Sequence, residues 1–168
     1  MLLRAATPSD LAAIVAIERL PESQKYVGQW SEERHRATLA GGDARYFVSE
    51  DEAGAVQAYA ILRGFADGPH NIELKRIVAA APGHGLGRWM LNEILRLAFN
   101  EFHAHRVFLD VFEDNHRAQH LYESAGFVYE GTMREAAMRG GKYCTLRLMS
   151  LLESEYRARA PAAVPSTV

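Results

Sequence analysis

Residues 82–87 read Pro82-Gly83-His84-Gly85-Leu86-Gly87 and separate a predicted strand, residues 72–79, from a long predicted helix, residues 87–102. Glycine has no Cβ, so a bound group can come close to the backbone. The first N–H groups of a helix have no partner inside the helix and lie at the positive end of its dipole. A strand, a glycine loop and a helix in this order therefore predict a site for a phosphate group.

Two other kinds of phosphate-binding loop do not match this stretch. A dinucleotide fold needs Gly-x-Gly-x-x-Gly after its first strand and an acidic residue about 20 positions later. Asp110 could imitate that acid, but the spacing here is Gly-x-Gly-x-Gly, and about 80 residues of predicted helices and strands precede it. A P-loop needs Lys-Ser or Lys-Thr after the glycines, and neither follows. The sequence thus favours a different kind of phosphate site.

A second informative block spans residues 115–127. Asn115 is a suitable helix cap, and Gly126 stands where a left-handed residue ends a helix. Between them the apolar positions follow helical spacing, at Ala118, Leu121, Tyr122 and Ala125. The block predicts a short amphipathic helix between the strand 105–112 and a closing hairpin of strands 127–138 and 143–152.

Together the two blocks resemble the GNAT superfamily of N-acetyltransferases over residues 3–155. The first superfamily motif, Gln or Arg, two residues, Gly, one residue, Gly or Ala, maps onto Pro82, Gly85 and Gly87. Pro82 departs from it, because proline has neither a charge nor an N–H. The second block follows the pattern of Asn, Ala, Leu-Tyr and Gly-Phe closely. Within the superfamily, residues 72–78 and 149–152 resemble the ribosomal-protein-alanine and spermidine acetyltransferases.

The resemblance implies an α/β (α+β) fold: a mixed, mostly antiparallel twisted sheet of about seven strands, with helices on both faces and a splay at its centre. It also implies acetyl-CoA as cosubstrate. The pantetheine arm is expected to pair with one strand like an added strand, with the Val78 amide facing the thioester oxygen. The implied cofactor-binding residues are Ile77, Val78, Ala79, Gly83, His84, Gly85, Leu86, Gly87, Arg88, Asn115, Arg117, Ala118 and Tyr122.

The remaining pattern predicts a single domain over residues 1–155. Helices are expected over residues 8–19 and from the Ser31 cap to Gly41-Gly42, followed by strands 45–50 and 55–62. Residues 24–30 match neither pattern. Residues 156–168 contain prolines among small residues and are predicted to form a disordered tail.

Acetyl transfer to an amine needs a base for the amine and an acid for the departing thiolate. By resemblance, Tyr122 stands at the position of the acid, and its ordinary pKa of about 10 is not far above the 8.5 of a thiol. The alternative is a core aromatic on the inner face of its helix. Glu73 is the predicted base, acting directly or through water, and the alternatives are an exposed strand residue and proton loss to ordered waters.

The acceptor is expected to bind near Tyr26, Trp30, Glu73 and the loop 65–70, because the resemblance places it between the first helix pair and the late hairpin. The same aromatic rings could instead fill the core. The implied acceptor is a small-molecule amine or the amino terminus of a peptide or protein, and a homodimer is compatible with the resemblance. The alternative function is a non-catalytic domain that binds or senses acyl-CoA.

The sequence predicts no metal site. His116 and His120 are four residues apart and could share one helix face, but no His-Glu-x-x-His pattern accompanies them. Arg88 and Arg117 are expected either to add positive charge near the cofactor phosphates or to be solvated helix residues.

The composition is typical of a water-soluble domain. The 168 residues are 48% hydrophobic, and no apolar run approaches the roughly 20 residues that span a bilayer. A net charge of -2 with interspersed signs disfavours nucleic acid as a ligand. Cys144 stands alone and Met1-Leu2-Leu3-Arg4 lacks a secretory pattern, so we expect a cytoplasmic protein that binds no membrane.

Overall fold

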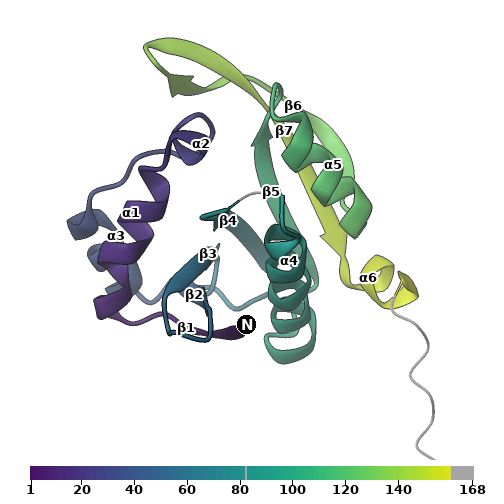
Figure 1. The fold of residues 1–168 in the computed structure, drawn as a ribbon. Helices are drawn as coiled ribbons and strands as arrows, with labels where there is room; N and C mark the ends of the chain where they lie inside the picture. The colour runs from purple at the N-terminus through teal and green to yellow at the C-terminus, as the bar shows by residue number, and fades with distance from the viewer. Residues whose placement is uncertain (82, 160–168) are drawn as a thin grey trace, which may run out of the picture.

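The computed structural model describes residues 1–81 and 83–159, and within them seven strands form one open sheet in the order β1-β2-β3-β4-β5-β7-β6. Neighbouring strands are antiparallel except for β4 and β5, which are parallel. Helices cover both faces of the sheet (Figure 1). The fold class expected from the sequence is confirmed.

The elements are β1 Leu2–Ala5, the 3-10 turn η1 Pro8–Asp10, α1 Leu11–Glu18, α2 Pro21–Gln24, α3 Glu32–Ala40, β2 Ala44–Glu50, β3 Val56–Arg63, β4 Asn71–Ala79, α4 Leu86–Arg96, the π-helical turn η2 Leu97–Glu101, β5 Arg106–Phe112, α5 His116–Ala125, β6 Val128–Arg139, β7 Lys142–Leu152 and α6 Glu153–Arg159.

Each face of the sheet has its own hydrophobic cluster. On one face α4 buries Met90, Leu91 and Ile94, which recur at helical spacing and form one stripe. On the other face α1 buries Leu11 and Ile14 against β2 and β3. Burying both faces stabilises the central strands, and it fixes the position of the strand ends that line the site.

The sheet parts between β4 and β5. These strands pair only at Asn71–Glu73 with Arg106–Phe108. One cause lies on the other side of β4, where the register against β3 shifts so that Ile61 opposes Arg76 while Leu62 opposes Leu74. Lys75 is therefore an extra residue, and such a bulge bends and twists its strand. The free edge of β4 beyond the bulge is where the expected central splay occurs.

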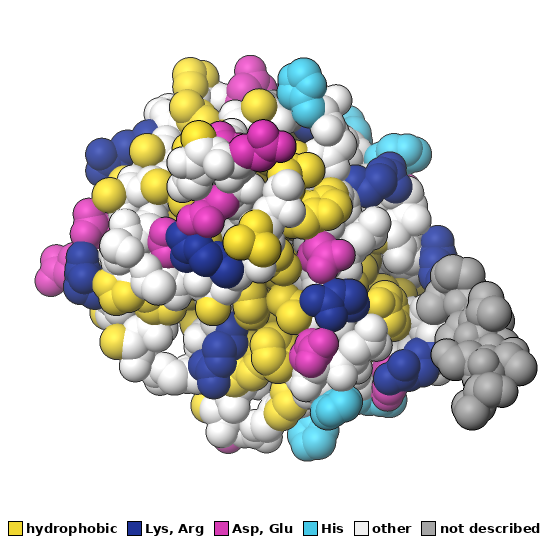
Figure 2. Space-filling view, turned by 60° about the horizontal axis from the view of Figure 1, so that its bottom comes forward, with side chains coloured by type: hydrophobic (Ala, Val, Ile, Leu, Met, Phe, Trp, Pro, Cys, Tyr) yellow, Lys and Arg dark blue, Asp and Glu magenta, His cyan; other side chains and the backbone are white. Residues whose placement is uncertain are grey.

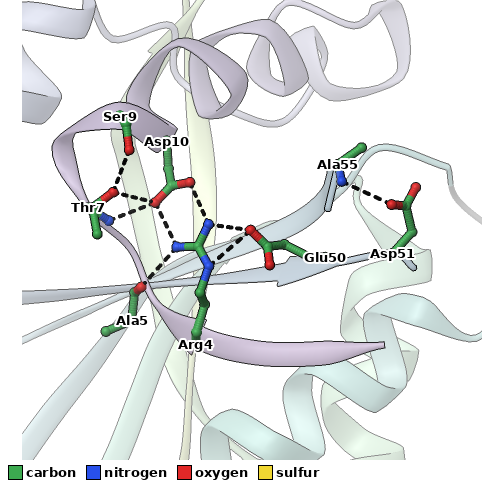
Figure 3. Close-up of polar contacts among 8 residues, drawn as sticks. All are labelled: Arg4, Ala5, Thr7, Ser9, Asp10, Glu50, Asp51 and Ala55. Carbon is green, nitrogen blue, oxygen red and sulfur yellow. Dashed lines mark hydrogen bonds and ion pairs between the residues drawn. The ribbon is translucent and has the colours of Figure 1, made fainter. Parts of the chain in front are cut away.

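The strand β1 was not predicted from the sequence. It forms the edge of the sheet against β2, and Arg4 fixes it by donating to both oxygens of Asp10 at 2.7 and 2.8 Å and by pairing with Glu50 (Figure 3). Asp10 also accepts from the N–H of Thr7 at 2.7 Å. The Arg4 guanidinium, followed by the Thr7 donors, lowers the pKa of Asp10 to about 2 despite its burial. Side-chain bonds, rather than an apolar alternation, therefore hold this strand in place.

The carboxyl-terminal prediction is wrong for residues 156–159, which continue α6 instead of starting a disordered tail. Tyr156 stacks on Phe99 at 4.6 Å between ring centroids, and the Arg159 guanidinium donates to the Ser124 carbonyl at 3.3 Å. These contacts give the helix apolar and polar partners that small residues and prolines alone did not reveal. The rest of the predicted tail, residues 160–168, lies outside the described residues.

The surface carries both signs of charge. Figure 2 shows Lys and Arg side chains alternating with Asp and Glu over one face, without a single large basic area. Among the described residues, no helix combines the length and the apolar composition that crossing a membrane requires.

Candidate active site

A cavity of about 570 Å³ lies where β4, the glycine loop and α5 meet. It also contacts the α2 segment through Glu22, Ser23, Tyr26 and Val27. Most residues expected to bind the cofactor line it, namely Ile77, Val78, Ala79, Gly83, Gly85, Gly87, Arg88, Asn115, Arg117, Ala118 and Tyr122. Three separate parts of the chain, residues 22–27, 77–88 and 114–122, are thus brought to one hollow, as a single binding site requires.

The glycine loop presents an open surface at the start of α4. Gly85 is the amino-terminal cap of this helix, with φ 78°, and no side chain caps the first turn. A Cβ added at Gly83 or Gly85 would meet no atom within 4 Å, so the space beside both backbones is free. Helix N–H groups in this setting suit an anion such as a pyrophosphate. Pro82, the residue that departs from the superfamily motif, lies outside the described residues.

Two expected cofactor residues do not line the cavity with their side chains. Leu86 is buried in the core, where it anchors the first turn of α4. His84 is exposed within the loop. Either residue could contact a phosphate through its backbone, but the Leu86 side chain serves the packing of the helix.

The free edge of β4 presents alternate backbone groups. The Ala80 N–H donates to the Gln57 carbonyl of the β3 segment at 2.8 Å, and Val78 opposes Tyr59 in the same register. Because hydrogen-bonding sides alternate along a strand, the Val78 amide is directed toward β3 as well. The amides of Ile77 and Ala79 are directed to the gap. The alternation therefore favours these two, rather than Val78, as groups that face a ligand.

Tyr122 lies on the inner face of α5 and lines the cavity. Burial, and then the negative charge of Asp110, raise the pKa of its hydroxyl. The helix is placed as predicted, because the Asn115 side chain accepts from the Ala118 N–H at 3.2 Å and Gly126 ends the helix at φ 104°. Because its pKa is raised, the Tyr122 hydroxyl is protonated near neutral pH.

Glu73, the predicted base, is engaged in ion pairs. Its Oε1 accepts from Lys75 Nζ at 3.1 Å, and its Oε2 lies 3.5 Å from Arg63 Nη1. Glu73 is also not among the residues that line the cavity. The carboxylate is therefore held by two cations at the closed end of the splay.

Asp110 is a carboxylate that the sequence analysis did not assign to catalysis. It lies on β5 beyond the last residues that pair with β4, and Lys75 Nζ is 4.0 Å from its Oδ2. Burial raises its pKa, which the charge of Lys75 partly offsets and that of Glu73 reinforces. Its negative charge also contributes to the raised pKa of Tyr122. Like Glu73, Asp110 is not among the residues that line the cavity. One signal was present, since Asp110 is a charged residue within the apolar run of β5.

The expected acceptor residues divide between two places. Tyr26 lines the cavity, and its hydroxyl donates to the Asp114 carbonyl at 3.2 Å. Trp30 instead packs in the second hydrophobic cluster, with the Arg76 guanidinium 4.0 Å above its ring. Phe65, in the loop 65–70, packs edge to face on Phe102 in the core beneath α4. The alternative reading of these aromatics as core residues therefore holds for Trp30 and Phe65.

The two candidate histidines, His116 and His120, line the cavity. Over residues 1–81 and 83–159, no group of three His, Cys, Asp or Glu side chains is arranged to hold a metal ion. The side chains that line the cavity thus include two histidines, two tyrosines, two arginines and two carboxylates.

This arrangement of a splayed sheet, a glycine loop before α4 and a tyrosine on α5 defines a class of acyl-transferring proteins, and the chain belongs to the acetyltransferase (GNAT) family, whose model matches residues 13–127. The resemblance expected from the two motifs is confirmed.

More particular similarities come from single proteins. The chain is 36% identical to the spermidine N(1)-acetyltransferase of Vibrio cholerae serotype O1 over 78 residues, which are 46% of this chain and 45% of that protein. A mutant of the Vibrio cholerae spermidine N-acetyltransferase SpeG superposes with a TM-score of 0.82 at 28% identity, over 96% of this chain and all of that one. A complex of the Vibrio cholerae enzyme with CoA and spermine gives 0.81 at 28% identity, over 93% and 97% of the two chains.

Proposed function

We propose that the protein transfers the acetyl group of acetyl-CoA to a primary amine of a small diamine or polyamine, by direct attack of the amine on the thioester. The observation that carries this proposal is the single cavity shared by the glycine loop, the free edge of β4 and Tyr122. One similar protein is named a spermidine N(1)-acetyltransferase, and a similar structure is a complex with CoA and spermine. Both support a polyamine as the acceptor.

The acetyl donor would be held mainly by backbone groups. The N–H groups around Gly83 to Arg88 suit the pyrophosphate, since the α4 dipole adds positive potential there. The amides of Ile77 and Ala79 suit the pantetheine arm as an added strand, and one of them is our choice for the donor to the thioester oxygen. Arg117 also lines the cavity and adds positive charge.

The proton transfers can be assigned to two side chains. An acceptor amine with a pKa of about 10.4 arrives as an ammonium ion, and Asp110 takes its proton directly or through water. The amine nitrogen then bonds to the thioester carbon, the carbon–sulfur bond breaks, and the second proton that the nitrogen loses on becoming an amide passes to solvent water. Tyr122 donates its proton to the leaving sulfur. The tyrosinate regains a proton from the Asp110 carboxyl, so both groups return to their initial state.

The function is tested by following free thiol from acetyl-CoA in the presence of alkylamines, diamines, spermidine and a peptide with a free amino terminus. We expect the fastest release with diamines or spermidine. Release with the peptide alone would move the acceptor class to amino termini. Binding of acetyl-CoA without thiol release across the whole panel would favour the non-catalytic acyl-CoA sensor.

Replacing Tyr122 by Phe is expected to lower kcat about 100-fold, because general acid catalysis typically contributes at least that factor. The affinity for CoA should stay unchanged in calorimetry, since the ring still fills its place. Tyr156→Phe is the matched control, because that hydroxyl lies on α6 and the ring stacks on Phe99. Wild-type turnover by Tyr122→Phe would remove this residue as the acid.

The two carboxylates that are candidates for the general base predict different pH profiles of kcat/KM. Asp110→Asn should lower kcat/KM and remove the acidic limb of its pH profile, whereas Glu73→Gln should retain that limb. Because burial raises the pKa of Asp110, the limb should lie above the ordinary aspartate value of about 3.9. Loss of the limb in Glu73→Gln, with the limb intact in Asp110→Asn, would restore Glu73 as the base.

A further inference from the structure

Arg139 occupies a cage of groups that suit a cation. Its Nη2 lies 2.7 Å from Asp114 Oδ2, and its Nη1 donates to the Lys25 carbonyl at 3.2 Å. The centre of its guanidinium is 4.8 Å from the Phe112 ring and 5.5 Å from the Tyr26 ring. A carboxylate, a carbonyl and two aromatic faces are also the groups that recognise an organic ammonium ion.

The cage is built where three distant segments meet. Tyr26 follows α2, Phe112 and Asp114 end β5 and begin the turn to α5, and Arg139 is the last residue of β6. Figure 1 shows the β6–β7 hairpin curving over α2, which brings its tip to this place. The ring centroids of Tyr26 and Phe112 are 6.2 Å apart, so the aromatic part of the cage persists without Arg139.

The cage borders the cavity that we assign to the reaction. Asp114 and Tyr26 line that cavity, and Asp114 and Arg139 also line a neighbouring cavity of about 400 Å³ that Glu113, Cys144 and Thr145 complete. An acceptor bound with one amine at the thioester could thus extend a second amine toward Asp114. The other ionisable side chains near the cage are Lys25, whose Nζ lies 4.9 Å from the Tyr26 ring, Glu113 and His116.

We propose that Tyr26, Phe112 and Asp114 form a subsite for the distal ammonium group of a diamine or polyamine, and that the Arg139 guanidinium occupies this subsite until the acceptor displaces it. The inference rests on the proposed function, because it assumes an amine acceptor. Arg139 acts as an internal competitor, and Asp114 determines the preference for acceptors with two positive charges.

Moving the Arg139 side chain out of the subsite costs little free energy. The side chains of Arg139 and Asp114 are 30% and 48% exposed, and ion pairs this open to solvent contribute little net stability. Arg139 also directly precedes Gly140 and Gly141, whose φ values of 57° and 77° form the hairpin turn. The arginine can therefore leave for solvent without disturbing a packed core.

The test compares α,ω-diamines of three to eight carbons with n-alkylamines of the same lengths. Asp114→Asn should lower the ratio of kcat/KM for the diamine to that for the monoamine roughly tenfold, because one charged contact is lost. Arg139→Gln should raise this ratio, through a lower KM for the diamine. Arg134→Gln is the matched control, since this exposed arginine lies on the same strand and outside both cavities.

Calorimetric titration with the best diamine of the series provides a readout besides turnover. Its affinity should rise in Arg139→Gln and fall in Asp114→Asn, and thermal melting should show all variants folded. Ratios and affinities that match the wild type in both variants would overturn the subsite, and so would a lower diamine preference in Arg139→Gln. If the wild type released no thiol with any amine, the proposed function would be rejected. The calorimetric titration with the diamine would still test the subsite, because it does not depend on turnover.

Discussion

Replacing Gly85 by Asp is expected to raise the dissociation constant for CoA at least 100-fold. The backbone at this position has φ 78°, and an added Cβ would enter the open space beside the loop. The new carboxylate would then stand where the N–H groups of α4 meet the pyrophosphate. Two like charges 4 Å apart repel by about 4 kcal/mol at an effective dielectric constant of 20, which corresponds to roughly a thousandfold in affinity.

The control for this variant is Gly54→Asp. Gly54 has φ 80°, an added Cβ there also meets no atom within 4 Å, and it lies in the turn between β2 and β3, away from the cavity. Both variants carry the same backbone strain and the same charge, so they should lose similar thermal stability. Only Gly85→Asp should lose CoA in calorimetric titration. Wild-type affinity in Gly85→Asp, or an equal loss in Gly54→Asp, would contradict the phosphate assignment.

The parts of the site that the sequence predicted are those made by local interactions. The Asn115 cap and the Gly126 terminator act within a few residues of themselves, and both are found at the ends of α5. The same holds for the glycine loop, where the positive φ of Gly83 and Gly85 follows from the short connection to α4. Such signals can be read from the chain because their physical cause lies within one turn of it.

The exact position of the splay was harder to predict because it depends on a bulge. Strand residues alternate between the faces of a sheet, so one extra residue reverses the faces of all that follow. The extra residue Lys75 lies immediately after Glu73 and Leu74, and no change in the apolar pattern indicates a bulge there. Where the β4 edge becomes free therefore depends on the pairing of β3 with β4, which the local pattern does not contain.

The contacts of Trp30 could not be predicted from the sequence for a related reason. Its partner Arg76 is 46 positions away, and the guanidinium that stacks on Trp30 also pairs with Glu18 at the end of α1. Polar residues such as Glu18 and His35 are expected on the outer face of a helix, yet both are almost fully buried here. Their burial requires partners from several strands, which a helical pattern cannot reveal.

These residues form a buried polar cluster that joins α1, β3, β4 and the segment after α2. Glu18 accepts from the Arg76 guanidinium, from the Tyr59 hydroxyl and from the Trp30 N–H at 3.2 Å. His35 Nε2 lies 3.2 Å from Glu18 Oε1, outside the angle of a hydrogen bond. Arg76 directly precedes the free edge of β4, and Trp30 follows the segment that carries Tyr26. The cluster thus ties β4 to the segment after α2, and both of these segments carry residues that line the cavity.

Glu18→Ala is accordingly expected to lower the free energy of unfolding by about 3 to 5 kcal/mol, the usual cost of removing one partner from a buried ion pair. The Glu18 and Arg76 side chains are only 1% and 7% exposed, so water cannot replace the lost carboxylate. Glu32→Ala is the matched control, because its ion pair with Arg36 is about half exposed, and it should cost less than about 0.5 kcal/mol. Denaturant unfolding of the three proteins measures both differences.

The difference between wild type and Glu18→Ala should also depend on pH. Burial alone would raise the pKa of Glu18, but the hydrogen bonds from its neighbours and the charge of Arg76 outweigh it and lower the pKa. A carboxylate with a lowered pKa stabilises the fold above its unfolded pKa of about 4.3, and this contribution is lost as the pH falls below that value. The stability difference should therefore be complete at pH 7 and shrink in acid. A difference under 1 kcal/mol at pH 7, or one that grows below pH 4, would show that burial of the charge outweighs its pairing.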